Sequence, residues 1–250
     1  MPVLAEGLFS TLVNLQDAIR KDFGWDLEND HNSIIHLLDS LRSSGIERWA
    51  DSSRNDTFES LKNILSNAEQ VLIIGAAAEP SEVEYHLDGK ISIIVADGAI
   101  GVFQELSPTA RSKAWAALIA IVSDADGLPY ITHPAAQNIP FLLHAHGDNK
   151  SAWANILSIW QSKPPPLVIT HQCPEHIEGA FNPGAFTDGD RAIAIALYMQ
   201  VAPENVILCG FTTENIGRWS GRTKPALKMR KLQWMAEVIR ICGVDWGESR

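Results

Sequence analysis

Six short apolar runs mark the second part of the chain, and helical patterns separate them. Nearly every position within a run is apolar, which is typical of strands buried on both faces, as in parallel sheets covered by helices. The alternation of runs and helices predicts an α/β fold with a doubly wound, mainly parallel sheet of about six strands. The runs are VLIIG (71–75), ISIIVADG (91–98), LIAIVSDADG (118–127), IPFLLHAHGD (139–148), LVITHQC (167–173) and VILCGFT (206–212).

The segments between the runs carry the start signals of helices. Ser107 and Pro108 supply an N-cap and a first-turn proline for the helical pattern that follows them. Asp148 or Asn149 precedes a second pattern, and Asp188 opens a third, which continues as DRAIAIALYMQVA from Asp190. Helices in these places are the connections that parallel strands need.

Residues 1–68 show helical periodicity without any visible chemistry. Apolar residues recur at helical spacing from Leu8 to Phe23 and again further on, and residues 56–59 resemble the capping box of a third helix. We interpret this part as a helical N-terminal segment that serves packing or dimerisation, so a homodimer is the assembly that it suggests. Residues 69–250 then form the α/β domain.

Composition narrows the class of protein. Hydrophobic residues make up 46% of the chain and charged residues 20%, as in ordinary globular proteins, and no apolar run reaches the roughly 18 residues needed to cross a bilayer. The N-terminus lacks the basic start and cleavage site of a secretory signal. Three widely spaced cysteines suit a reducing cytoplasm, and the net charge of −10 argues against nucleic acid as a partner.

Acidic residues follow several of the predicted strands. The carboxyl ends of parallel strands meet at one edge of the sheet, where ligands bind in such folds. Each residue alone is also explained as a turn residue or a helix cap. Clustered carboxylates, however, raise one another's pKa, and each pKa unit corresponds to about 1.4 kcal/mol. The ionised cluster is therefore unfavourable unless a cation neutralises it. The residues are Asp97, Asp124, Asp126, Asp148, Asp188 and Asp190.

The ligand types favour Mg²⁺ as this cation. The D-x-D spacing predicts Asp124 and Asp126 on the same side of an extended chain, roughly 7 Å apart at Cα. Mg²⁺ prefers one or two protein carboxylates together with water and substrate phosphates. The alternative is a zinc hydrolase site, since an H-x-H-x-D element lies next to the D-x-D element. Its ligands would be His144, His146, Asp148 and His171.

A basic stretch near the C-terminus offers a counterpart for phosphate groups. In an acidic protein these cations could hold a polyphosphate while the aspartates hold its metal. Lys224, Lys228 and Lys231 are spaced so that one helix face presents all three. A solvated basic helix face is the alternative, above all for Arg230. The stretch contains Arg218, Arg222, Lys224, Lys228, Arg230 and Lys231.

The order of these motifs resembles a known family. After a helical preface the chain shows GAAAEPS, VADGA, SDADG, HAHGDN, FTDGDRA and GFT. This set resembles the archaeal 6-hydroxymethyl-7,8-dihydropterin pyrophosphokinases, the MptE-like or DUF115 proteins, which are distantly similar to thiamine pyrophosphokinases. The resemblance runs from about residue 70 to 232. It implies Mg²⁺-dependent transfer of the β,γ-diphosphate of ATP to the hydroxymethyl group of a dihydropterin, giving AMP and a pterin diphosphate for folate-type or methanopterin cofactors.

The resemblance and the residue patterns together predict roles for individual residues. The metal ligands are expected among Asp124, Asp126 and Asp148, with Asp97 as a further acid. The catalytic group is expected to contain Asp148, Asp190 and Lys228. Contacts to the nucleotide or substrate are expected from Asp97, Gly98, Asn149, Asp188, Arg191, Lys224 and Lys231. One departure is that GAAAEPS has Ala77 where the family has the second glycine of its G-x-G-P-S turn, which puts a phosphate-binding role of this loop in doubt.

Several alternatives stay open from the residues alone. The general base could be Asp148, His144 or His146. A thiamine pyrophosphokinase would use the same metal site with a different acceptor pocket. The zinc hydrolase and a non-enzymatic nucleotide-binding module belong to other functional classes.

Overall fold

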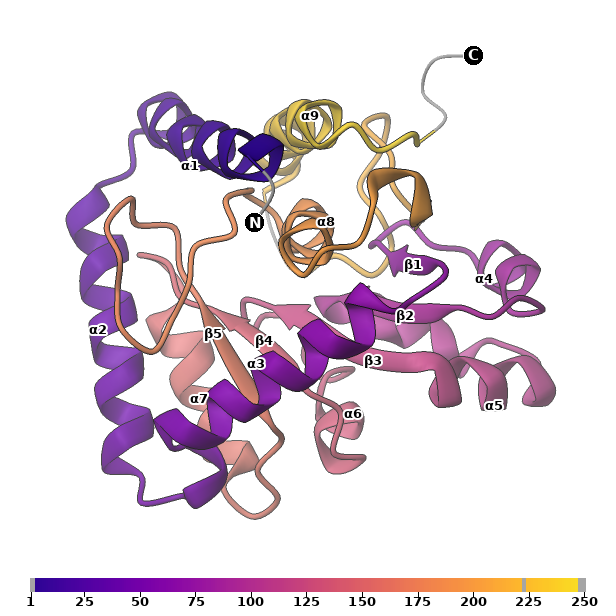
Figure 1. Cartoon of the computed structure of the whole chain (residues 1–250), viewed down its shortest axis with the longest axis horizontal. Helices are drawn as coiled ribbons and strands as arrows, with labels where there is room; N and C mark the ends of the chain where they lie inside the picture. Colours follow the sequence, from indigo (N-terminus) through magenta and orange to yellow (C-terminus); the bar gives the residue numbers. More distant parts are fainter. Residues whose placement is uncertain (1–2, 222–223, 247–250) are drawn as a thin grey trace.

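The centre of the molecule is one six-stranded sheet (Figure 1). The computed structural model describes residues 3–221 and 224–246. All neighbouring strands pair in parallel, in the order β5-β4-β3-β2-β1-β6, so the predicted doubly wound parallel sheet is confirmed. The strands are β1 (Val71–Ile74), β2 (Ser92–Ala96), β3 (Leu118–Ser123), β4 (Phe141–His144), β5 (Leu167–Thr170) and β6 (Val206–Cys209).

The strand order creates a switch point beside β1. Strands β2 to β5 are added in sequence on one side of β1, whereas β6 returns to its other side. Connections that leave in opposite directions open a crevice at the carboxyl ends of the strands at such a point. The acidic residues of the sequence lie at this edge.

Successive strand residues face opposite layers, because the side-chain period of a strand is two. Leu72 and Ile74 pack into one core, and Val71 and Ile73 pack into the other. The first core is completed by residues of α2 (Leu27–Ser43), α4 (Pro80–His86), α5 (Pro108–Ala117), α6 (Thr132–Ala136) and α7 (Lys150–Trp160), and of the 3₁₀ helices η1 (Glu47–Trp49) and η2 (Asp97–Gln104). The second is completed by α1 (Val3–Phe23), α3 (Asp51–Ser66), α8 (Asp188–Tyr198) and α9 (Pro225–Cys242). A third 3₁₀ helix, η3 (Pro203–Asn205), precedes β6.

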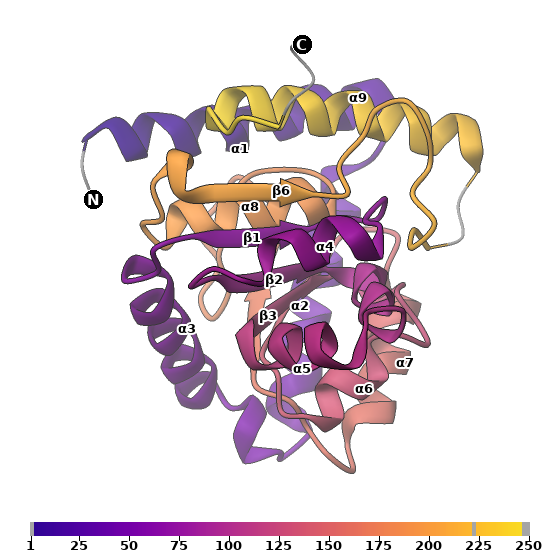
Figure 2. The ribbon, with the colours of Figure 1, turned by 90° about the vertical axis from the view of Figure 1, so that its right-hand side faces the viewer.

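The three N-terminal helices share these cores with the sheet. Figures 1 and 2 show α1 beside α9, although the two lie near opposite ends of the chain. Leu12 of α1 and Leu61 of α3 are buried in the second core, and Leu37 of α2 is buried in the first. A separate role for residues 1–68, including dimerisation, stays a prediction. Within the described ranges, no helix has both the length and the apolar character that a membrane span requires.

The start of α3 was predicted too late. The capping-box pattern at residues 56–59 lies inside a helix that begins at Asp51. The cap residue is Ala50, which has no side chain able to accept a hydrogen bond from the helix. The first helical residues are polar, so neither a cap nor an apolar repeat indicated the true start.

Candidate active site

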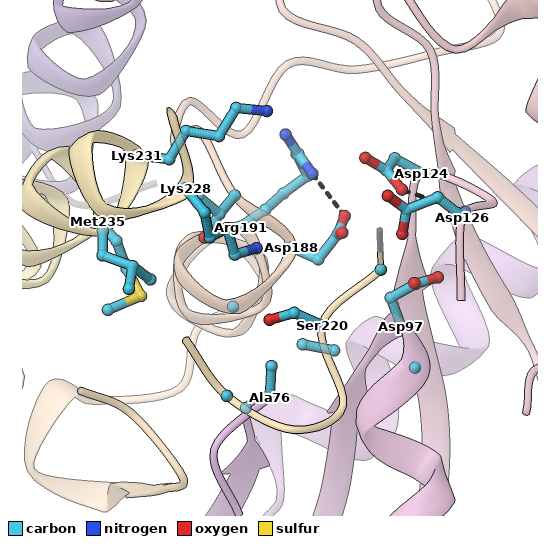
Figure 3. Close-up of a pocket in the computed structure, with 18 of the residues that line it drawn as sticks. Ala76, Asp97, Asp124, Asp126, Asp188, Arg191, Ser220, Lys228, Lys231 and Met235 are labelled. Carbon is cyan, nitrogen blue, oxygen red and sulfur yellow. Dashed lines mark hydrogen bonds and ion pairs between the residues drawn. The ribbon is translucent and has the colours of Figure 1, made fainter. Parts of the chain in front are cut away.

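A pocket lies at the carboxyl edge of the sheet, next to the switch point (Figure 3). Its walls come from the loops after β1, β2, β3, β4 and β6, from the first turn of α8 and from one face of α9. Carboxylates project from the sheet side, and lysines project from α9 (Figure 3). The pocket therefore brings the acidic and the basic groups of the sequence together.

Three carboxylates converge in this pocket. Asp97 directly follows β2, Asp124 follows β3 and Asp188 begins α8, and one oxygen atom of each lies within 4.8 Å of the others. Among the described residues this is the group whose geometry could hold a metal ion. Hard oxygen donors suit Mg²⁺. The triad contains Asp124 from the predicted ligand set and Asp97, which was predicted both as a further acid for the metal and as a substrate contact. It adds Asp188, which was predicted as a substrate contact.

Asp97 is held in an unusual backbone conformation. Its φ of 45° lies in the left-handed region, and its carboxylate accepts a hydrogen bond from the Ser123 hydroxyl. A Cβ atom at Gly127 would come within 2.3 Å of Asp97 Oδ2, so only glycine fits there. Left-handed non-glycine residues are uncommon and cluster at functional sites. The local fold thus directs this acid toward the other two.

Burial and mutual repulsion act on two of the three acids. Burial raises the pKa of Asp97 well above its usual value, and the negative charges of Asp188, Asp124 and Asp126 raise it further. The pKa of Asp188 is also raised well above normal by burial and by Asp124, although Arg191 opposes the shift. Both ionised carboxylates are therefore unfavourable until a cation compensates them.

Asp124 behaves in the opposite way. Burial acts to raise its pKa, but the hydrogen bond and the charge interaction with His146, followed by the charges of Arg191 and Lys231, lower it to about 2. The His146 Nε2 atom lies 3.5 Å from Asp124 Oδ2. Asp124 is thus the member of the triad whose pKa lies below its ordinary value, so its ionised form is favoured at neutral pH.

The D-x-D element is a turn, which corrects the extended geometry predicted from its spacing. Strand β3 ends at Ser123, and Ala125 has a φ of 75°. The Asp126 amide donates to Asp124 Oδ1 over 3.3 Å, so the backbone turns here and is not extended as in a strand. Asp126 still lines the pocket, and burial followed by Asp124 raises its pKa. Asp148 lies at the exposed rim of the same pocket.

The first turn of α8 contains one acid that faces the pocket and one that caps the helix. Asp188 lines the pocket and pairs with Arg191 over 2.8 Å. Asp190 is fully buried, accepts backbone hydrogen bonds from Phe186 and Thr187, both over 2.7 Å, and completes a capping box. It is not among the residues that line the pocket. The capping hydrogen bonds use both oxygens of Asp190, and its catalytic role stays a prediction.

The histidines do not form the zinc site that was weighed as an alternative. His144 is completely buried, its ring nitrogens contact Thr170 and Gln172, and burial lowers its pKa well below normal. Burial lowers the pKa of His171 to about 4, and its Nδ1 accepts from the Cys173 amide. Only His146 lines the pocket. The two buried histidines are satisfied structural residues, and a zinc hydrolase is not favoured.

Asn149 fixes the loop that carries His146. Its side-chain amide donates to the carbonyls of Asp124 and His144, over 2.9 and 2.7 Å, and accepts from the His146 amide. The residue is buried, although it borders the pocket. It ties the loop after β4 to the D-x-D turn, which orients both beside the triad.

The basic stretch divides into pocket residues and surface residues. Lys228 and Lys231 line the pocket. Lys224 precedes α9, is exposed and is not among the lining residues, so the structure does not place all three lysines in the pocket. Arg230 instead pairs with Asp22. The side chain of Arg218 pairs with Glu79 and Glu105, and Arg222 falls outside the described residues.

The GAAAEPS loop packs against the loop after β6. The Ala77 amide donates to the Gly210 carbonyl over 2.9 Å, and the Ala78 amide donates to Gly75. A Cβ atom at Gly75 would lie 2.7 Å from the Gly210 oxygen, so this glycine permits close approach of two backbones. Two amides of the loop are therefore already bonded, which agrees with the doubt about a phosphate cradle. Gly98 lines the pocket as predicted from the sequence, and the Trp219 carbonyl lies against it.

Several pocket residues were missed from the sequence. Trp25 reaches the pocket from the turn between α1 and α2, and Phe186 and Trp219 reach it from long loops. Trp25 and Trp219 belong to no motif or periodic spacing that indicates a site, and Phe186 begins the FTDGDRA motif, of which only the acidic and basic residues were singled out. Their place depends on how distant segments pack, which the local pattern does not encode.

Comparison with known proteins identifies relatives along most of the chain. No family model matches the sequence. Proteins named 6-hydroxymethyl-7,8-dihydropterin pyrophosphokinase are similar to it in three archaea. The one from Pyrococcus furiosus is 28% identical, covering 89% of each chain, and the one from Methanothermobacter thermautotrophicus is 28% identical, covering 92% of this chain and 90% of its own. The Methanocaldococcus jannaschii protein is 29% identical, and the match covers 73% of this chain and 71% of that protein. The resemblance noted in the motifs is confirmed, and it extends into the N-terminal helices.

Proposed function

From the homology of this chain to the archaeal 6-hydroxymethyl-7,8-dihydropterin pyrophosphokinases, we propose that it is a diphosphotransferase with ATP as donor. Its acceptor is the hydroxymethyl group of 6-hydroxymethyl-7,8-dihydropterin, and its products are AMP and the pterin diphosphate. The observation that carries the proposal is a pocket in which three convergent carboxylates face two lysines. Such a pocket suits a polyphosphate together with its metal.

The donor set fits Mg²⁺. Asp97, Asp124 and Asp188 supply oxygen ligands close to one another, and two of them have pKa values raised by burial and repulsion. A cation relieves that repulsion. When bound there, Mg²⁺ supplies charge neutralisation for the phosphates. Asp126, which lines the same pocket, is close enough to raise the pKa of Asp97 and is the candidate for a further ligand or for a water-mediated contact.

The cationic side chains bind the phosphates and neutralise their negative charge. Lys228 and Lys231 extend from α9 toward the carboxylates (Figure 3). Burial lowers the pKa of Lys231, while the charge of Asp124 raises it. Charged hydrogen bonds from these ammonium groups can bind the transferring diphosphate and the AMP leaving group. Arg191 holds Asp188 in place through its ion pair.

The remaining chemistry is alignment and one proton transfer. The acceptor oxygen attacks the β-phosphorus, the bond from that phosphorus to the α,β-bridging oxygen breaks, and AMP leaves with this oxygen. Asp148 at the rim can accept the hydroxyl proton. His144 is unsuited to this role because it is buried and lies outside the pocket lining. We propose that the reaction takes place in the cytoplasm and serves folate-type or methanopterin cofactors.

A comparison of acceptors tests the proposal against a thiamine pyrophosphokinase. With ATP and Mg²⁺ held constant, the dihydropterin is expected to be converted with a kcat/KM at least about a hundredfold higher than thiamine, since sites built for one hydrogen-bonding pattern reject another. Mass spectrometry of the products measures both reactions. Preferential formation of thiamine diphosphate would contradict the proposal.

A further inference from the structure

Trp25 is an aromatic wall of the pocket contributed by the N-terminal helices. It lies in the turn between α1 and α2, outside the α/β part of the chain, yet it lines the same pocket as the carboxylate triad. The side chain is half-buried. The sequence of the N-terminal segment indicates no chemistry, yet the segment contributes this side chain to the pocket.

Phe23 and Lys231 both pack against the ring of Trp25 at the pocket wall. Phe23 stacks on the indole, with ring centroids 4.7 Å apart and planes inclined by 20°. Arg230 lies over Phe23 at 4.7 Å and pairs with Asp22, so α9 fixes this turn from behind. Phe186, from the loop before α8, lies 5.8 Å from Trp25 at an angle of 48°. These contacts position the indole at the pocket wall.

Lys231 connects this wall to the reacting centre. Its Nζ atom lies over Trp25 at 5.2 Å and over Phe186 at 5.6 Å from the ring centroids. The same ammonium interacts with the charges of Asp124 and Asp188. The aromatic wall and the carboxylate triad thus lie on either side of one cation. A lysine side chain is flexible, and polyphosphate can draw the ammonium off the indole face.

We propose that the indole of Trp25 stacks on the pterin ring of the acceptor, with Phe186 beside it; this inference rests on the proposed function. The pterin ring is joined to its reacting hydroxyl by a single carbon, so it must bind within a few ångströms of the phosphates. Adenine is separated from the β-phosphorus by the ribose and the α-phosphate. Lys231 lies between Trp25 and the carboxylate triad, so Trp25 is as close to the phosphates as the pterin ring must be. Stacking on an aromatic ring also suits a planar heterocycle.

Titration calorimetry with two probes tests this subsite. The probes are 6-hydroxymethyl-7,8-dihydropterin and an ATP analogue with a methylene group between the α- and β-phosphorus, both with Mg²⁺. Trp25→Ala is expected to weaken pterin binding by roughly five- to hundredfold and to leave binding of the analogue unchanged, as for loss of one stacking partner. Trp25→Phe should retain most of the affinity. Trp25→Leu keeps an apolar side chain without an aromatic ring, so its pterin affinity should lie between those of Trp25→Phe and Trp25→Ala.

Controls separate the possible failures. Tyr85→Ala removes an aromatic side chain that is 81% exposed on α4, and it should change neither affinity. If Trp25→Ala does not fold, the Phe and Leu variants decide the question. Equal pterin affinity in wild type and in the variants that fold overturns the subsite alone. Loss of analogue binding in place of pterin binding overturns it in favour of adenine. Failure of the wild type to bind the pterin overturns the proposed function, and the subsite falls with it.

Discussion

Replacing Asp97 with asparagine is expected to reduce turnover by at least about a hundredfold while leaving the metal-free protein as stable as the wild type or slightly more stable. Asparagine keeps the shape, an acceptor for Ser123 and tolerance of the left-handed φ, so it removes only the charge. Loss of a metal ligand costs several kcal/mol of transition-state stabilisation, and each 1.36 kcal/mol is a factor of ten. Steady-state kinetics and thermal unfolding in a chelator measure the two effects.

The stability effect follows from the direction of the pKa shift. The pKa of Asp97 is raised in the folded protein, so at neutral pH its ionised form lowers the free energy of unfolding. Asp124→Asn should also abolish turnover but should lower stability. The pKa of Asp124 is lowered to about 2, so its charge contributes stability above the unfolded pKa of about 4, which is lost as the pH falls toward 2.

Ligand-induced stabilisation provides a further readout for these variants. Mg²⁺ with ATP at about 100 times the dissociation constant should stabilise the wild type by roughly 2.7 kcal/mol, and both variants should lose most of this gain. Asp88→Asn is the matched control, because Asp88 is exposed on the surface and pairs with Lys113. Full activity of Asp97→Asn would assign Asp97 to a turn without a catalytic function.

The double replacement of Lys228 and Lys231 by alanine is expected to be the second large effect. Each charged hydrogen bond to a phosphate contributes about 1.5–3 kcal/mol, so the double variant should use ATP at least a hundredfold less efficiently. Removal of two ammonium groups from beside the carboxylates should also weaken nucleotide binding more than it weakens binding of the pterin alone. Kinetics with ATP as the varied substrate measure the effect.

Lys224→Ala is the matched control for the two lysines. Lys224 directly precedes the same helix but is exposed and lies outside the pocket lining, so its replacement should leave ATP use unchanged. A loss of efficiency comparable to that of the double variant would restore the original expectation that all three lysines act together. Unchanged kinetics in the double variant would instead make this surface a solvated basic face.

The sheet was predictable because burial on both faces leaves a simple local pattern. All six apolar runs are strands, and the helix after Ser107 begins at Pro108 as its cap predicts. Because ligands bind at the carboxyl ends of parallel strands, the acids that follow the strands were predicted to lie together at one edge of the sheet. The start of α3 escaped prediction because Ala50 provides no side-chain cap.

The details of the site were less predictable, because they depend on backbone turns and on distant contacts. The left-handed Ala125 converts D-x-D from an extended pair into a turn, and no spacing indicates this. Asp188 and Asp190 have the same residue type two positions apart, but helix geometry directs one into the pocket and the other into a capping box. Trp25 enters only because α1 packs against α9.

The nucleotide product is the most direct test of the central proposal. The purified protein is incubated with ATP, Mg²⁺ and 6-hydroxymethyl-7,8-dihydropterin, and nucleotides and pterins are quantified together over time. Transfer of a diphosphate as one unit requires one AMP for each pterin diphosphate, with no ADP formed in proportion. Stoichiometric ADP, with a pterin monophosphate or with free phosphate, would contradict the account.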